Sequence, residues 1–390
     1  MRPGSHERWR MLAALTFART SMGFQFQCVA PLAPFVAAEL RLDNAQLGWL
    51  IGIYLLPGIA LALPGGLLGA RYGDKRVALT GFALMALGGL WLAAAPSYGQ
   101  AQAARLVSGA GAVIMNVMLT KMVADWFEGR ERVLAMSVLI NAWPIGIGLA
   151  LLALAPLAEY TAWRMAMGTA ALFCACGFTT LAAVYRPPAA AALAAASTGV
   201  GIAVLNAREW RLLAIASIPW MAYNAAYQIV VSFLPVMLLE RGSSIARSGA
   251  MTAINTIIII ASVQAGGLLL KRARSPDTLC HAAIVGWSAS LVLLAGGSAP
   301  LLWIVLGGLI AGLPAGAFVN MPAEFLRPES RGVGMGVFYT LFYFGCALLP
   351  GAAGHLADVA GSARATLWLA AGLAFICVPV LVLFRRAMRT

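Results

Sequence analysis

The sequence predicts an all-α membrane protein with twelve transmembrane helices in two pseudo-symmetric six-helix bundles. Three observations predict it: the composition, a series of apolar stretches of membrane-spanning length, and an internal repeat. The 390 residues are 61% hydrophobic and only 11% charged, and the mean hydropathy is +0.85. One soluble core cannot bury that much apolar surface, so we expect the remainder to face a lipid bilayer.

Each apolar stretch is long enough for a helix that crosses the hydrocarbon layer, which takes about 20 residues. Only helices satisfy their own backbone in lipid, and these stretches are too long and too uniformly apolar for barrel strands. The first stretch follows basic residues but lacks a small-residue cleavage site, so we interpret it as a retained span and not as a signal peptide. The predicted spans lie near residues 10–37, 46–69, 78–95, 102–124, 134–156, 163–184, 210–239, 248–270, 277–295, 301–325, 333–353 and 364–384.

The net charge of +13 is explained by membrane orientation, and we expect no nucleic acid partner. Most Lys and Arg residues fall in loops on one side of the predicted membrane, whereas the other side carries only Arg41, Arg241, Arg247 and Arg364. This positive-inside pattern predicts a multi-pass protein of a bacterial-type inner (plasma) membrane with both termini in the cytoplasm. The six cysteines lie in predicted spans and indicate neither a disulfide framework nor a metal site, and no cofactor is expected.

The second half of the chain repeats the first. An offset of 201 residues aligns Gln27 with Gln228, Pro34 with Pro235, Glu39 with Glu240, and 65–68 with 266–269, and an offset of 199 aligns Asp125 with Glu324 and Arg132 with Arg331. Shared Gln, Pro, Glu and Arg positions at one offset are uncommon by chance. The repeat predicts six-span bundles at 1–185 and 210–390 joined by a cytoplasmic linker at 186–209, whose alanine-rich part is a candidate amphipathic helix.

The predicted loop between spans 2 and 3 carries a motif. Residues 66–76 read Gly-Leu-Leu-Gly-Ala-Arg-Tyr-Gly-Asp-Lys-Arg. This segment resembles the loop 2–3 signature of the major facilitator superfamily, Gly-x-x-x-Asp-Arg-x-Gly-Arg-Arg/Lys. The resemblance implies a cytoplasmic gating motif, although the acidic position of the signature is Ala70 here and one basic position is Asp74. The matching residues are Gly66, Arg71, Gly73, Lys75 and Arg76.

Two further segments are similar to the same family. Arg105 and Gly109 match its Arg-x-x-x-Gly motif of span 4, and residues 22–27 and 121–127 look similar to bacterial cyanate/nitrate-type facilitators. The resemblance implies a secondary transporter and not an enzyme. It also implies a solute site at the midplane between the bundles, reached by alternating access, and we expect the protein to be a monomer in the bilayer.

Arg19 is the residue that most strongly suggests a substrate class. An arginine at the centre of a transmembrane helix costs about 2.5–3.5 kcal/mol on insertion scales, and no carboxylate occupies the middle of a predicted span to neutralise it. Gly23 and Gln27 follow at i+4 and i+8, so we expect one open polar face that binds a small anion through the guanidinium. The alternative is that Arg19 reaches the inner interface or donates to helix carbonyls. Arg105 is equally an interface anchor or a second anion contact.

Span 7, the repeat partner of span 1, presents a second polar face. Its residues fall within about 140° of helical arc, and we expect them to line the solute path, although hydrogen bonding between helices is the alternative. Single polar residues in spans 4, 10 and 11 are further candidates for which packing is at least as good an explanation. The span 7 candidates are Trp220, Tyr223, Asn224, Tyr227 and Gln228, and the others are Asn116, Asn320, Tyr339 and Tyr343.

Coupling and direction of transport stay open at this stage. A proton is one candidate coupling ion, but its possible carriers His281, His355, Asp358 and Glu324 all lie at the ends of predicted spans, and exchange or facilitated diffusion are the alternatives. The leading hypothesis is a carrier for a small anion. The second is a proton-coupled exporter of drugs or metabolites with the same fold, and a non-transporting sensor is a third. A membrane enzyme is disfavoured because membrane-depth carboxylates and paired metal ligands are missing.

Overall fold

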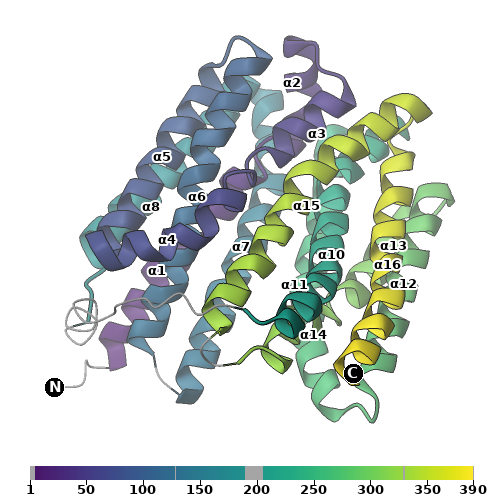
Figure 1. The fold of residues 1–390 in the computed structure, drawn as a ribbon. Coiled ribbons are helices and arrows are strands. Elements are labelled where there is room, and N and C mark those ends of the chain that lie inside the picture. Colours follow the sequence, from purple (N-terminus) through teal and green to yellow (C-terminus); the bar gives the residue numbers. More distant parts are fainter. Residues whose placement is uncertain (1–4, 128, 189–204, 328–329, 390) are drawn as a thin grey trace. The chain divides into compact units, whose positions relative to one another are not determined.

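The computed structural model describes residues 5–127, 129–188, 205–327 and 330–389, and all regular secondary structure within these ranges is helical (Figure 1). The chain divides into two compact units. The first contains residues 1–32 and 53–201, and the second contains 33–52 and 202–390. The linker helix considered for residues 186–209 falls mostly on 189–204, outside the described residues.

The first unit is built from long helices that pack mainly as neighbours α5 with α6, α1 with α7, and α5 with α8. Gly81 and Gly111 allow α5 and α6 to touch, because a Cβ at either would lie under 3 Å from the other's carbonyl oxygen. Such small residues permit close helix packing within a membrane. The elements are α1 (Ser5–Phe26), η1 (Ala30–Leu32), α4 (Gly58–Tyr72), α5 (Asp74–Ala94), α6 (Tyr98–Trp126), α7 (Gly129–Tyr160) and α8 (Trp163–Val184).

The second unit surrounds its most buried helix, α10, which packs against α15 and α16. A capping box in which Asn206 and Glu209 each accept the other's backbone N–H starts α10. The elements are α2 (Ala33–Leu40), α3 (Asn44–Gly52), α10 (Ala207–Glu240), α11 (Ile245–Arg272), α12 (Pro276–Gly296), α13 (Pro300–Ala311), α14 (Ala315–Asn320), η2 (Met321–Glu324), α15 (Arg331–Ala360) and α16 (Arg364–Arg389).

Among the described residues, 10 helical stretches are long and apolar enough to cross a membrane, and they correspond to predicted spans 3–12. The first two predicted spans are broken. Span 1 was expected to be continuous over 10–37, but α1 ends at Phe26 and the chain turns before η1 and α2. Span 2 is divided into α3 and α4 by a turn at 53–57. Hydropathy averages over a window, so it does not detect such breaks inside an apolar stretch.

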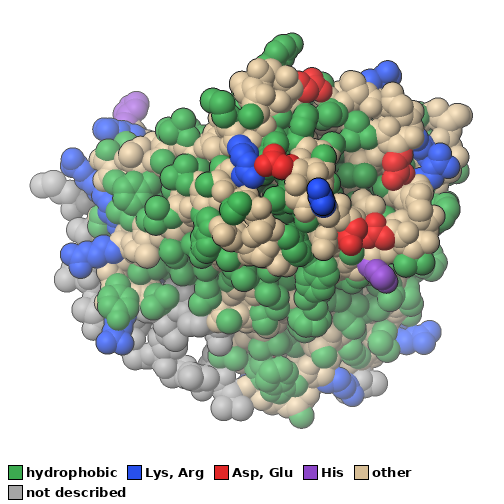
Figure 2. Space-filling view, turned by 90° about the horizontal axis from the view of Figure 1, so that it is seen from above, with side chains coloured by type: hydrophobic (Ala, Val, Ile, Leu, Met, Phe, Trp, Pro, Cys, Tyr) green, Lys and Arg blue, Asp and Glu red, His purple; other side chains and the backbone are tan. Residues whose placement is uncertain are grey.

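Large apolar side chains cover much of the exterior, as expected for a surface that faces lipid. Leu87 and Leu172 in the first unit and Leu268 and Leu309 in the second are exposed. Figure 2 shows one face, on which hydrophobic side chains are widespread and charged side chains occur as scattered patches. The protein is therefore a multi-pass membrane protein.

Candidate functional site

An aromatic cluster in the second unit brings together predicted site residues from two helices. The Trp220 ring of α10 lies nearly parallel to the rings of Tyr223, Phe338 and Phe342, with centroid distances of 6.2, 6.3 and 6.1 Å and interplanar angles of 19°, 15° and 28°. Tyr223 and Phe338 are buried, whereas Trp220 and Phe342 are half-buried. The two helices therefore form one aromatic cluster in which Trp220 and Phe342 keep part of their surface accessible.

The tyrosines predicted on α15 belong to the same cluster. Tyr339 makes an edge contact with Phe342 at 6.0 Å, and Tyr343 makes one with Phe342 at 5.0 Å. Sequence analysis identified both tyrosines but missed Phe338 and Phe342, because phenylalanine carries no polar atom that sets it apart from a lipid-facing residue. Their spacing from Tyr339 and Tyr343 along one helix is the signal that was present. We call Trp220, Tyr223, Phe338, Tyr339, Phe342 and Tyr343 the aromatic wall.

Two side-chain donors on the same helix lack an acceptor. Trp220 Nε1 and Gln228 Nε2 are buried and have no hydrogen-bond partner among the described residues. Asn224 differs, because its Nδ2 donates to the Trp220 carbonyl oxygen at 2.8 Å, within the same helix. Buried donors in folded proteins are nearly always paired, so these two donors are suited to receive an oxygen atom from water or a solute. Tyr227 lies between them in sequence and is half-buried.

Asn320 is exposed at the end of α14, and none of the described contacts joins it to the aromatic wall. In the first unit, Arg19 on α1 and Asn116 on α6 are half-buried, and Gln27 is buried just beyond the end of α1. Gln27 lies one residue beyond the end of α1, and its backbone N–H still donates to the Gly23 carbonyl oxygen at 3.2 Å.

The expectation that the Arg19 face is open was wrong at Gly23. A Cβ at Gly23 would lie 2.2 Å from the carbonyl oxygen of Trp143, and one at Gly146 would lie 2.1 Å from that of Thr20. The two glycines let the backbones of α1 and α7 touch. Packing between these helices, and not a solute path, therefore occupies the middle of this face.

Arg105 is entirely buried, and the structure shows what surrounds it. Its guanidinium lies 4.3 Å from the Tyr54 ring centroid and donates to the carbonyl oxygens of Gln25 at 3.3 Å and Phe26 at 3.1 Å. These are the last carbonyls of α1, where a positive charge is favourable. Arg105 thus caps the broken first span, and Gly109 allows this because a Cβ there would lie 1.9 Å from the Tyr54 carbonyl oxygen.

The predicted gating motif lies at the junction of α4 and α5. Gly73 has φ of 86°, a left-handed conformation that favours glycine, and it links the two helices. Lys75 donates to the carbonyl oxygens of Ala182 and Tyr185 at 2.8 and 2.7 Å, at the end of α8. Arg71 lies 5.3 Å from the Tyr72 ring centroid, and Arg76 is exposed. Gly66 lies in α4, but its surroundings are outside the described residues.

The acidic residue of this motif is present at a shifted position. Asp74 takes the place of a basic residue in the signature, and its carboxylate pairs with Lys121 of α6 at 2.8 Å. The carboxylate missing at Ala70 is therefore matched by one four residues later that binds within the same unit. Lys75 and Asp74 together attach the start of α5 to both α6 and α8.

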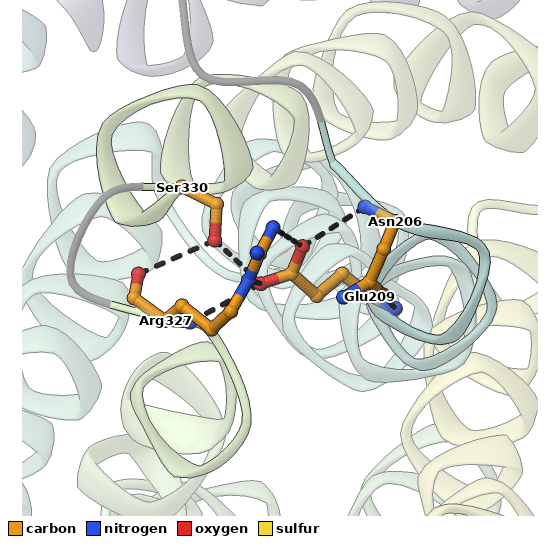
Figure 3. Close-up of polar contacts among 4 residues, drawn as sticks. All are labelled: Asn206, Glu209, Arg327 and Ser330. Atoms are coloured by element: carbon orange, nitrogen blue, oxygen red, sulfur yellow. Dashed lines mark hydrogen bonds and ion pairs between the residues drawn. The ribbon is translucent and has the colours of Figure 1, made fainter.

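An ionic cluster that sequence analysis missed holds the start of α10 (Figure 3). Glu209 is 4% exposed at its side chain, and its two carboxylate oxygens accept from Arg327 Nε and Nη2, each at 3.0 Å. Ser330 donates to the same carboxylate, and the Asn206 backbone N–H donates at 3.0 Å. The cluster therefore joins the end of the linker to the segment between η2 and α15.

Most of the candidate proton carriers form ion pairs or hydrogen bonds with nearby residues. Glu324 pairs with Arg385, which also contacts both carboxylate oxygens of Asp277, at 3.1 and 3.0 Å. A ring nitrogen of His281 lies 3.3 Å from the Val378 carbonyl oxygen. Asp358 accepts three hydrogen bonds from Asn44 and Ala45 of α3, and His355 is exposed. These contacts favour structural roles for Glu324 and Asp358 and identify no proton site.

Comparison with known proteins agrees with this architecture. The chain is 26% identical to the 3-(3-hydroxy-phenyl)propionate transporter of Escherichia coli (strain K12) over 346 residues, which are 85% of this chain and 83% of that protein. It is also 30% identical to the cephamycin export protein of Amycolatopsis lactamdurans over 142 residues. These residues are 36% of this chain and 29% of that protein.

A crystal structure of a mutant nucleoside transporter, NupG, has the same fold, with a TM-score of 0.78 at 16% identity, covering 97% of this chain and 99% of that one. The model of the Major Facilitator Superfamily matches residues 15–323. Twelve spans accord with that fold. The chain therefore belongs to the major facilitator superfamily of membrane transporters.

Proposed function

We propose that this protein is a secondary active transporter of a small organic anion that carries an aromatic ring. The bodies that move in alternating access are the halves 1–185 and 210–390, joined by the linker 186–209. We also propose an inner-membrane location with both termini in the cytoplasm, on the basis of the positive-inside pattern.

The aromatic wall carries the proposal. Its half-buried rings Trp220 and Phe342 offer flat surfaces for a second aromatic ring, and stacking of this kind contributes about 0.5–1.5 kcal/mol beyond burial. The unpaired donors Trp220 Nε1 and Gln228 Nε2 favour a solute that brings oxygen atoms. The Escherichia coli relative is named for a phenylpropionate, which combines an aromatic ring with a carboxylate.

Arg19 is assigned to the negative charge of the solute. A guanidinium binds a carboxylate through two parallel hydrogen bonds, which a neutral amide of the same shape cannot match. Asn116, Gln27, Tyr227, Asn224 and the tyrosines of α15 remain proposed contacts. If one proton accompanies each monoanion, net transport is electroneutral and responds to a pH gradient but not to membrane voltage.

Export of an amphipathic compound is the second candidate. It is favoured by the match to the cephamycin export protein, although that match covers 36% of this chain. The same aromatic wall suits a drug-like solute. The two candidates differ in the charge of the solute and in the direction of transport.

Uptake into proteoliposomes tests the proposal. The parent protein is expected to accumulate radiolabelled 3-phenylpropionate under an inward proton gradient, and to transport the neutral analogue 3-phenylpropionamide at least about tenfold more slowly, because a bidentate ion pair is lost. Equal rates for acid and amide would rule out the anionic assignment. Extrusion of amphipathic cations without uptake of any aromatic acid would favour the exporter.

A further inference from the structure

A pocket with basic walls lies in the first unit, between the start of α1 and the end of α8. Its volume is about 340 Å³, which falls within the range of about 300–1,000 Å³ that small-ligand sites occupy. The two helices meet here, because the Arg186 backbone N–H donates to Met11 Sδ at 3.4 Å. The charged and titratable side chains among its described lining residues are His6, Glu7, Arg10 and Arg186.

The charges of this pocket favour an anionic ligand. Neither the Arg10 nor the Arg186 guanidinium forms an ion pair or a hydrogen bond with any residue that the structure describes. With His6 neutral, these two cations exceed Glu7 by one positive charge. The first turn of α1 also lines the pocket, and the backbone N–H groups of a helix start add partial positive charge. A ligand with one negative charge therefore balances the site.

Arg186 is positioned at the pocket by its backbone, which leaves its side chain available. Trp126 Nε1 donates to the Arg186 carbonyl oxygen at 3.1 Å. The last carbonyl oxygens of α8 do not need Arg186 as a partner, because Lys75 Nζ donates to those of Ala182 and Tyr185 at 2.8 and 2.7 Å. The exposed Arg186 guanidinium can therefore donate to a ligand.

The pocket lies at the depth of lipid headgroups. Arg10 is the last charged residue of α1 before the uncharged stretch 11–18, so it marks the boundary between the polar and apolar parts of the helix. Trp9 beside it is 39% exposed, and tryptophan is enriched where a membrane meets water. A molecule bound at Arg10 is therefore placed between water and hydrocarbon.

An exposed apolar surface continues from the pocket along both helices. On α1, Arg10, Ala13 and Phe17 are exposed and share one face by helical spacing. The Phe17 ring contacts Phe173 of α8 at 5.3 Å, so the two helices lie side by side at this level. The exposed residues of α8 recur every three or four positions, at Leu172, Cys176, Thr179 and Ala183.

We propose that this pocket binds the phosphate of an anionic phospholipid whose acyl chains lie along the exposed faces of α1 and α8. Arg10 and Arg186 donate to the phosphate oxygens, as guanidinium groups do in phosphate sites. Basic pockets between membrane helices bind such headgroups. Phosphatidylglycerol fits best, because it carries one negative charge and its glycerol hydroxyls can donate to Glu7. The ammonium of phosphatidylethanolamine would cancel the phosphate charge and leave the excess positive charge of the pocket unbalanced.

Native mass spectrometry of the detergent-purified full chain tests the site by counting bound lipids. We expect the parent to retain one phosphatidylglycerol in preference to phosphatidylethanolamine. The Arg10→Gln, Arg186→Gln double variant should bind phosphatidylglycerol about 25-fold more weakly, because each basic residue near an anionic lipid contributes about fivefold. Equal retention of the two lipids by the parent, or unchanged binding in the double variant, would overturn the proposal.

Two further pairs of substitutions separate the site from general effects of charge and folding. Arg386→Gln with Arg389→Gln removes the same charge from exposed positions at the end of α16, and it should bind phosphatidylglycerol as the parent does. Arg10→Lys with Arg186→Lys keeps both charges and should recover most of the binding lost in the glutamine pair. A loss in the α16 pair as large as that in the glutamine pair would contradict a specific pocket.

Inorganic phosphate distinguishes a lipid site from a site for soluble anions. Millimolar phosphate is expected to leave the bound phosphatidylglycerol in place, because the acyl chains contribute contacts that phosphate lacks. Displacement of the lipid by phosphate would overturn the lipid assignment. Lipid counting needs no transported solute, so retention of phosphatidylglycerol without uptake of aromatic acids would contradict the proposed function only.

Discussion

The two halves make the same contact at the same pair of repeat positions with different chemistry. The offsets of 201 and 199 that align the repeats match Tyr54 to Asn255 and Arg105 to Ile304. In the first half, the Arg105 guanidinium lies over the Tyr54 ring. In the second, Asn255 Nδ2 donates to the Ile304 carbonyl oxygen at 2.9 Å. Corresponding backbones bring the same positions together, but a cation over an aromatic ring in one half is replaced by an amide that donates to a backbone carbonyl in the other.

A second contact near the start of each half joins the same repeat positions through different side chains. At the same offsets Arg8 matches Glu209, and Glu131 matches Ser330. Arg8 forms an ion pair with Glu131, whereas Glu209 accepts from Ser330 and from Arg327. The link between the first helix of a half and the segment before its fifth span is kept, and the sign of the charge is reversed. The repeat thus predicts which positions are in contact, but it does not predict the chemistry of that contact.

Replacing the buried Arg105 is expected to cause the largest loss of unfolding free energy. Arg105→Ala removes the donor to the Gln25 and Phe26 carbonyls and leaves a cavity, so we expect a loss of about 3–5 kcal/mol of unfolding free energy, measured by SDS titration in mixed micelles. Asn255→Ala, which removes the side-chain donor of the corresponding contact in the second half, should lose about 1 kcal/mol. Equal losses would show that the buried cation has no special role.

Glu209→Gln is expected to lose about 1–3 kcal/mol in the same titration. The side chain is 4% exposed, and the change leaves Arg327 and Ser330 donors facing an amide nitrogen or an uncharged oxygen. Because the Arg327 side chain is 51% exposed, solvent can satisfy part of its charge, which limits the loss.

Replacing Arg8, which matches Glu209 in the repeat, should cause the smallest loss of unfolding free energy. Arg8 and Glu131 are 25% and 49% exposed at their side chains, so Arg8→Gln is expected to lose at most about 1 kcal/mol. A loss as large as that of Glu209→Gln would contradict the expectation that the more buried of the two ionic contacts contributes more to stability.

Sequence analysis predicted the parts of this molecule that depend on composition and periodicity. Spans 3–12, the start of α10 near residue 210 and several members of the aromatic wall follow from hydropathy and helical spacing. The break after Phe26 could not be predicted, because Arg105, which stabilises it, lies 79 residues away in sequence. The Asn206–Glu209 capping box was visible in the sequence, but its pairing with Arg327 depends on tertiary contact.

The Arg19 face of α1 is a second case in which tertiary contacts could not be predicted from the sequence. Helical spacing placed Arg19, Gly23 and Gln27 together, but it contains no information on what packs against a glycine. The α7 backbone fills the space beside Gly23. A small residue next to polar ones is compatible with a solute path and with close helix packing, and only the neighbouring helix distinguishes them.

Solute discrimination by two single variants tests the proposed roles of Arg19 in recognising the charge of the solute and of Trp220 in recognising its ring. Initial uptake rates of 3-phenylpropionate, its neutral amide and the aliphatic hexanoate would be compared in the parent, Arg19→Gln and Trp220→Ala. We predict that Arg19→Gln loses the preference for acid over amide and keeps that for aromatic over aliphatic acid, and that Trp220→Ala does the reverse. If both variants keep both preferences, neither residue recognises the solute and the account is wrong.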